Sequence, residues 1–162
     1  MIIHVPNKNT LIIDDFKFRC SIGKGGINSN KKEGDYSTPK GLFGLRKLYF
    51  RKDRVGIPNC KIKKKVIKKE MAWCDNPKHK KYNEEIKTRN KNLKEGLYRK
   101  DHKYDYIISI SHNERKIPDK GSAVFIHLTK NYKSTAGCVA LKKKDFEILL
   151  KLIDNKTKIK IG

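Results

Sequence analysis

Residues 121–141, G-S-A-V-F-I-H-L-T-K-N-Y-K-S-T-A-G-C-V-A-L, contain two short apolar runs separated by a polar segment. The runs span residues 123–128 and 139–141, and their length and flanking turn residues predict two strands. His127 lies near the end of the first run, and Cys138 directly precedes the second. Two strands joined by the intervening loop would bring both side chains to the same end of a sheet.

A cysteine and a histidine within hydrogen-bond reach are the minimal parts of an activated thiol nucleophile. The small residues before Cys138 also let the backbone N–H groups of Gly137 and Cys138 turn toward a developing oxyanion. On spacing alone the alternative is a packing role, because free cysteines are among the most buried residue types. If Cys138 is the nucleophile, we expect its pKa to lie below the value of about 8.5 of a free thiol.

The same stretch resembles the active-site segment of the L,D-transpeptidase catalytic domain (YkuD-type) family, in which a histidine closes one strand and a Ser/Thr-x-Gly-Cys element opens the next. It is most similar to the branch that reads T-A-G-C-V-A-L, with Ala136 and Ala140 where the commoner pattern has His and Arg. The string T-P-K-G-L-F at residues 38–43 resembles the family's T-P-x-G-x-F element. The W-C-D segment at Trp73 and the R-x-D pattern at Arg99 resemble the same branch.

The resemblance implies cysteine-dependent acyl transfer on peptidoglycan stem peptides, with no metal or cofactor. Cys138 would attack the carbonyl between a diamino acid and a terminal D-amino acid and form a thioester. His127 would act first as base and then as acid, and the N–H groups of Gly137 and Cys138 would bind the oxyanion. The acyl group would pass to an amine, as in L,D-transpeptidases, or to water, as in L,D-carboxypeptidases. What replaces the family's side chains at Ala136 and Ala140 stays open.

The resemblance also suggests where substrate binds. Trp73 would line the substrate groove, or it would serve as a core anchor, as a lone tryptophan commonly does. Arg99 could hold a substrate carboxylate with its planar fork, or form a structural ion pair with Asp101 or Asp105. The expected substrate-binding residues are Trp73, Arg99, Ser134 and Thr135.

The chain is strongly basic. Its 40 Lys and Arg residues exceed its 17 Asp and Glu residues, for a formal net charge of +23. Such a balance favours anionic partners, although the basic residues are mostly lysines scattered along the chain. The alternative function is therefore a catalytically inactive basic protein of the same fold that binds nucleic acid or anionic envelope polymers.

The four cysteines, Cys20, Cys60, Cys74 and Cys138, show no C-x-x-C spacing, so we expect free thiols rather than a zinc site or a disulfide scaffold. The first residues lack the basic and apolar regions of a signal peptide, and no apolar run approaches the ~20 residues of a membrane span. The residues alone thus favour a soluble, cytoplasmic chain. The resemblance instead implies the periplasm or cell envelope.

A length of 162 residues predicts a single domain, residues 1–162, without internal repeats. The alternation in residues 16–22 predicts a strand whose Phe16, Phe18, Cys20 and Ile22 face inward. Apolar residues at i, i+3, i+4 and i+7 predict one clear helix over residues 142–154.

Further strands are expected at 2–5, 10–13, 42–49, 60–69, 107–110 and 157–161, with 60–69 at a sheet edge and an irregular insertion or short helix over 76–96. About eight strands and one helix predict a mainly β fold. The resemblance implies the same class, an antiparallel sandwich-like or barrel-like catalytic domain.

Overall fold

The computed structural model describes residues 1–162, apart from the side chains of residues 93 and 94. Strands dominate, so the prediction of a mainly β fold is confirmed. The strands are β1 (Ile2–Asn7), β2 (Thr10–Ile13), β3 (Phe16–Ser21), β4 (Ile27–Asn28), β5 (Thr38–Pro39), β6 (Gly41–Phe50), β7 (Lys63–Val66), β8 (Met71–Cys74), β9 (Glu85–Lys87), β10 (Lys94–Gly96), β11 (Tyr106–Ile110), β12 (Phe125–Leu128), β13 (Val139–Leu141) and β14 (Lys158–Ile161). The helices are α1 (Lys52–Val55), the 3₁₀ turn η1 (Lys91–Leu93) and α2 (Lys143–Leu152).

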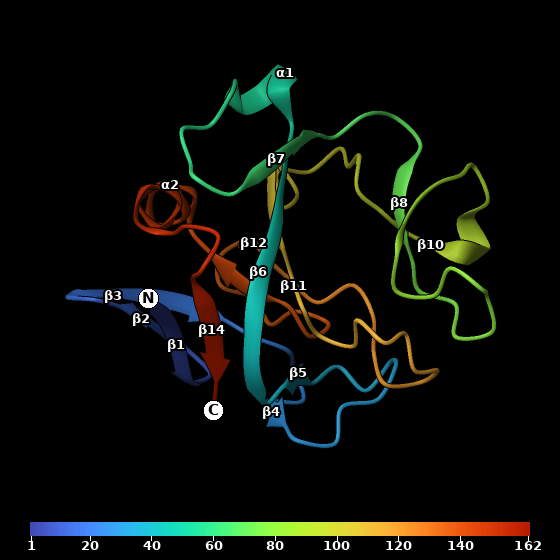
Figure 1. Cartoon of the computed structure of the whole chain (residues 1–162), viewed down its shortest axis with the longest axis horizontal. Helices are drawn as coiled ribbons and strands as arrows, with labels where there is room; N and C mark the ends of the chain where they lie inside the picture. Colours follow the sequence, from blue (N-terminus) through green and yellow to red (C-terminus); the bar gives the residue numbers. More distant parts are fainter.

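Eight strands close into a barrel-like ring in the order β11-β12-β13-β3-β2-β1-β14-β6, because β6 also pairs with β11. Most of the pairs in the ring are antiparallel, but β1–β14 and β12–β13 are parallel. β7 extends the sheet beside β6 as the expected edge strand (Figure 1). Closure leaves few unpaired edges in the ring, which protects it against pairing with other chains.

The ring encloses the main apolar core. Alternate residues of β1 to β3 point into it, so Phe18, Cys20 and Ile22 are buried as predicted. The inward prediction is wrong for Phe16, which is 42% exposed. Phe16 pairs with Ile13 beside the tight turn that joins β2 to β3, and its ring stacks on Phe18 at 5.8 Å between centroids. Its partner Ile13 is fully buried, so alternation gives the face on which Phe16 lies but not the exposure of its ring.

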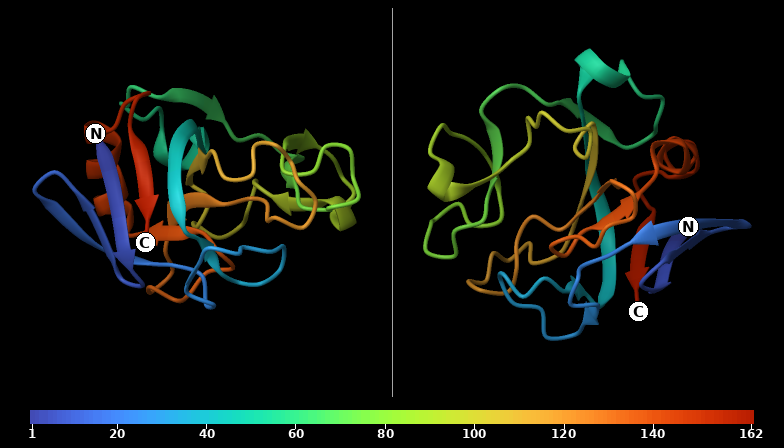
Figure 2. Two further views of the ribbon diagram at one scale, coloured as in Figure 1. Left: turned by 60° about the horizontal axis from the view of Figure 1, so that its bottom comes forward. Right: turned by 180° about the vertical axis from the view of Figure 1, so that it is seen from behind.

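The predicted helix is confirmed as α2, which begins and ends within two residues of the expected bounds. It buries Phe146, Leu149 and Leu150 and packs near β12. The ring of Phe146 stacks on that of Tyr106 at 5.2 Å. The helix lies beside the barrel, on the side away from β8 and β10 (Figure 1, Figure 2).

The segment between β7 and β11 forms a small sheet of its own, in the order β10-β8-β9. The insertion expected at 76–96 therefore contains two short strands as well as irregular chain. Together with the outer faces of β11 and β12 the segment encloses a second apolar cluster, and β11 is consequently buried at all five positions. The buried members of the cluster are Tyr49, Ile67, Met71, Leu97, Tyr104, Ile107, Phe125 and Cys138.

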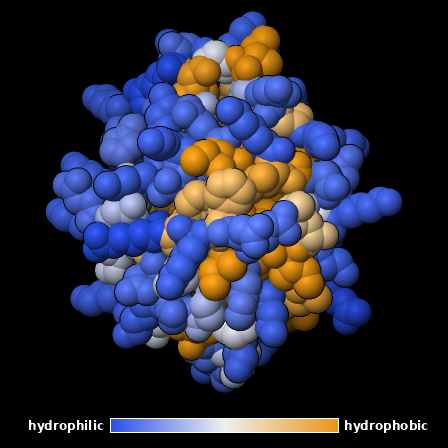
Figure 3. Space-filling view, turned by 90° about the vertical axis from the view of Figure 1, so that its left-hand side faces the viewer, coloured by the Kyte–Doolittle hydropathy of each residue, from blue (hydrophilic) through white to orange (hydrophobic). Residues whose placement is uncertain are grey.

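The face that carries the N-terminal strands and α2 is largely hydrophilic, with hydrophobic side chains gathered near its centre (Figure 3). Large apolar residues that stay exposed in this part of the chain include Ile2 and Phe16. Among the described residues, no helix has the length and apolar character needed to cross a membrane.

Candidate active site

The parallel pairing of β12 with β13 brings the two predicted catalytic residues together. Its register sets His127 opposite Ala140 and Ile126 opposite Val139, which puts Cys138 beside Phe125. The alternation of a strand then turns Phe125 and His127 to the outer face of the ring, away from the main core. Cys138 and His127 line one cavity of about 360 Å³ on this face.

Cys138 is buried, and its thiol is held by backbone groups of the preceding strand. Its Sγ donates to the carbonyl oxygen of Ala123 at 3.2 Å and accepts from the N–H of Phe125 at 3.3 Å. Burial raises the pKa of Cys138 to about 12. The expectation of a lowered pKa is therefore wrong for the resting site, because desolvation outweighs the nearby positive charge.

His127 is oriented by a hydrogen bond to the backbone. Its Nδ1 lies 2.8 Å from the carbonyl oxygen of Leu128. A carbonyl only accepts, so the proton resides on Nδ1 and Nε2 keeps its lone pair. Burial lowers the pKa of His127 to about 4, and the ring of Tyr104 packs edge-on against it at 5.2 Å. The imidazole is thus a neutral, fixed base at physiological pH.

Gly137 lies where its own backbone segment meets those of Gly23 and Ser37. Its φ is +144°, and a Cβ at this position would lie 2.8 Å from the carbonyl oxygen of Ser37. Its N–H, a predicted oxyanion donor, donates in the resting site to Oγ1 of Thr135 at 3.1 Å. Thr135 Oγ1 in turn donates to the carbonyl oxygen of Cys138 at 2.6 Å. Hydrogen bonds within the turn therefore fix the backbone that precedes Cys138.

Among the predicted substrate-binding residues, Ser134, Thr135 and Arg99 line the cavity. Arg99 is also engaged with Asp101 by two hydrogen bonds, of 3.0 Å from Nε and 2.7 Å from Nη2. This is the ion pair that the sequence left open as an alternative.

Trp73 is absent from the residues that line this cavity. Its ring packs edge-on against Phe125 and Tyr49, at 5.1 and 6.1 Å. Its Nε1 donates to Oδ1 of Asn83 at 2.8 Å. These contacts match the core anchor, one of the two roles that the sequence left open.

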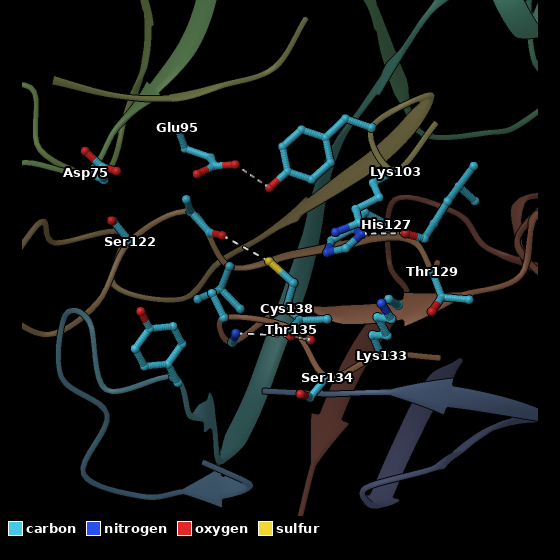
Figure 4. A pocket seen from close by; sticks show the side chains of 18 of the residues that line it. Asp75, Glu95, Lys103, Ser122, His127, Thr129, Lys133, Ser134, Thr135 and Cys138 are labelled. Carbon is cyan, nitrogen blue, oxygen red and sulfur yellow. Dashed lines mark hydrogen bonds between the residues drawn. The ribbon is translucent and has the colours of Figure 1, made fainter. Parts of the chain in front are cut away.

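Several polar residues of the cavity wall are missing from the sequence-based prediction, although Asp75 belongs to the W-C-D segment and Glu95 lies in β10. Figure 4 shows Asp75 and Glu95 to one side of Cys138, with Lys103 and Lys133 to the other. Burial raises the pKa of both Asp75 and Glu95. The additional polar lining residues are Lys31, Glu33, Tyr36, Asp75, Glu95, Lys103, Tyr104, Ser122, Thr129, Lys130 and Lys133.

The cavity therefore has an acidic side and a basic side, with the thiol between them. Such a wall suits a substrate that carries both ammonium and carboxylate groups. Within the described residues, no group of three or more His, Cys, Asp or Glu side chains is placed to hold a metal ion.

Comparison with known proteins gives one family. Residues 2–161, nearly the whole chain, match the sequence profile described as the L,D-transpeptidase catalytic domain (YkuD). No curated protein and no solved structure matches the chain.

Proposed function

The chain belongs to the L,D-transpeptidase catalytic domain family, and on that premise we propose that it is a cysteine-dependent acyltransferase acting on peptidoglycan stem peptides. The match over 2–161 confirms the resemblance seen in the sequence. The observation that carries the proposal is the pair of Cys138 and His127 on neighbouring parallel strands, lining one cavity. The fixed tautomer of His127 leaves Nε2 as an acceptor for the thiol proton.

In the proposed reaction, Cys138 Sγ attacks the carbonyl carbon between the diamino acid and the terminal D-amino acid. The thiol proton passes to His127 Nε2 as the C–S bond forms, and the carbonyl electron pair moves onto oxygen. His127 then protonates the leaving amine as the C–N bond breaks, which leaves a thioester on Cys138. An amine or water attacks this thioester, His127 accepts the proton of that nucleophile, and the thiol is restored.

The oxyanion would be bound by the N–H groups of Gly137 and Cys138. Because Gly137 donates to Thr135 at rest, binding of the oxyanion requires this N–H to leave Oγ1. A well-aimed donor stabilises such a transition state by about 3 kcal/mol. The proposed substrate is cell-wall material, so the proposed site of action is the cell envelope.

The proposal is tested by intact mass after incubation with a carbapenem, since enzymes of this family are acylated by carbapenems through their cysteine. We expect one adduct on the parent protein and none on Cys138→Ala. Cys60→Ala, which removes a half-buried thiol at a distance from the cavity, is the matched control and keeps the adduct. An adduct on Cys138→Ala, or none on any of the three proteins, contradicts the proposal.

A further inference from the structure

Lys31 is a charged residue that is only 7% exposed. Its Nζ donates to the carbonyl oxygen of Lys32 at 2.9 Å and to Oδ1 of Asp35 at 2.5 Å. A lysine ammonium carries three N–H groups. Among the described residues the third has no hydrogen-bond partner, although Lys31 forms part of the wall of the active-site cavity.

Two glycines make room for this side chain. A Cβ at Gly121 would lie 3.0 Å from Cγ and 3.1 Å from Cε of Lys31, and a Cβ at Gly137 would lie 3.7 Å from its Nζ. The stem of the lysine therefore crosses Gly121, and its ammonium reaches Gly137, the residue that precedes Cys138. Since φ is positive at both glycines, any other residue there would be strained as well as crowded.

The loop that carries Lys31 is held rigidly against the nucleophile. Asp35 accepts from Lys31, from the N–H groups of Lys32 and Ser37, and from Ser37 Oγ at 2.7 Å. Partial burial opposes ionisation, but these hydrogen bonds hold the pKa of Asp35 well below its usual range. Ser37 in turn packs its carbonyl against Gly137. The ammonium is thus fixed in place before any substrate arrives.

We propose that Lys31 is a buried cation of this active site whose ammonium stabilises the negative charge that develops beside Gly137 and Cys138 during acyl transfer. The proposal rests on the proposed function of Cys138 as nucleophile. A preorganised charge in a buried site acts strongly, because little water screens it and no reorganisation is needed. Consistently, the charge of Lys31 lowers the pKa of Cys138 and partly offsets the larger effect of burial, which raises it.

The alternative is that Lys31 serves only as the partner of Asp35 in a loop-stabilising ion pair. The two roles differ in what Asp35→Asn does to the thiol. If the ion pair only stabilises the loop, that stabilisation is lost whichever of the two residues is replaced. An electrostatic effect on Cys138 has opposite signs, because Lys31→Met removes a positive charge and Asp35→Asn removes a negative one.

The test is the rate of alkylation of Cys138 by iodoacetamide between pH 7 and 9, followed by peptide mapping so that the four cysteines are resolved. Below the pKa the rate is proportional to the thiolate fraction. We expect Lys31→Met to react about tenfold more slowly than the parent at each pH, which corresponds to a pKa shift of about one unit. Asp35→Asn is expected to react as fast as the parent or faster. Lys143→Met, which removes an exposed charge on α2, is the control and leaves the rate unchanged.

An unchanged rate in Lys31→Met overturns the proposal, and so does an equal slowing in Lys31→Met and Asp35→Asn. If circular dichroism shows that Lys31→Met is unfolded, Asp35→Asn decides alone, and slower alkylation in that variant overturns the proposal. Alkylation needs no peptidoglycan. A carbapenem adduct on the parent together with an unaffected Lys31→Met variant therefore refutes the role of Lys31 and leaves the proposed function intact.

Discussion

At the scale of single residues, His127 and Cys138 line one cavity as two uncharged groups. The pKa of His127 is lowered to about 4 and that of Cys138 raised to about 12, in each case by burial. A thiolate–imidazolium pair formed before substrate binds would place two charges where burial deprives them of hydration. We therefore expect the thiol to lose its proton in the same step in which it attacks the carbonyl.

The buried imidazole makes stability depend on pH. Its folded pKa of about 4 lies below the unfolded value of about 6.5, so between these values the unfolded chain binds a proton that the folded chain excludes. Stability must fall as pH falls through this window. We expect the parent to lose up to about 3 kcal/mol more than His127→Gln between pH 7 and pH 4, as measured by urea unfolding. Equal losses in the two proteins would show that His127 is hydrated or charged in the folded state.

Gly137 offers a second residue-scale prediction. Gly137→Ala adds a Cβ 2.8 Å from Ser37 O at a positive φ, so we expect a loss of about 1–3 kcal/mol in urea unfolding and no carbapenem adduct. Gly96→Ala is the matched control, because no atom lies within 4 Å of a Cβ there. A fully stable and reactive Gly137→Ala variant would mean that the three backbone segments do not meet as closely as described.

At the scale of elements, Asn83 links the small sheet to the segment that holds Cys138. Its Oδ1 accepts from Trp73 Nε1 at 2.8 Å and from the N–H of Ala123 at 3.2 Å. Its Nδ2 donates to the carbonyl oxygens of His112 and Asn113. Ala123, with φ of +52°, is the residue whose carbonyl holds the Cys138 thiol. One connection from the insertion to the thiol therefore runs through the amide side chain of Asn83.

Removing this amide is expected to affect both stability and reactivity. Asn83→Ala loses four hydrogen bonds of about 1 kcal/mol each, so we predict a loss of about 2–4 kcal/mol in thermal or urea unfolding. The alkylation rate of Cys138 should change with it, because Ala123 is released. Asn155→Ala, at an exposed loop position, is the control for both measurements. If the variant is destabilised but the alkylation rate of Cys138 is unaltered, the insertion does not influence the reactivity of the thiol.

The sequence is most informative where a reactive side chain lies at the end of a strand that the sequence pattern predicts. His127 and Cys138 lie at the ends of strands that the apolar runs mark, so the pair could be found from local pattern. Lys31 could not be found in this way, because nothing in the sequence of a polar loop indicates that two glycines distant in the chain leave room for its buried side chain. The inward prediction fails for Phe16 because alternation predicts the face of a strand on which a side chain lies but not how completely that side chain is covered.

At the scale of the whole molecule, the formal charge of +23 comes from basic residues that are scattered along the chain. We expect a mixed-sequence DNA duplex to bind weakly, with log K falling steeply against log salt. Cys138→Ala should bind equally well, which fluorescence anisotropy at several salt concentrations can measure. Tight binding that selects one sequence, with an affinity that also falls with salt, would instead support the alternative of a nucleic-acid-binding protein.

Closure of the ring through β14 has a consequence for biosynthesis. β14 pairs with β1 on one side and β6 on the other, so β1 cannot pair on its β14 side until residues 158–161 have been synthesised. While the chain is still on the ribosome, β1 and β6 present unpaired edges that any other extended segment can join. The barrel therefore closes only after residues 158–161 have been translated, and a nascent chain that lacks them is the form most in need of a chaperone.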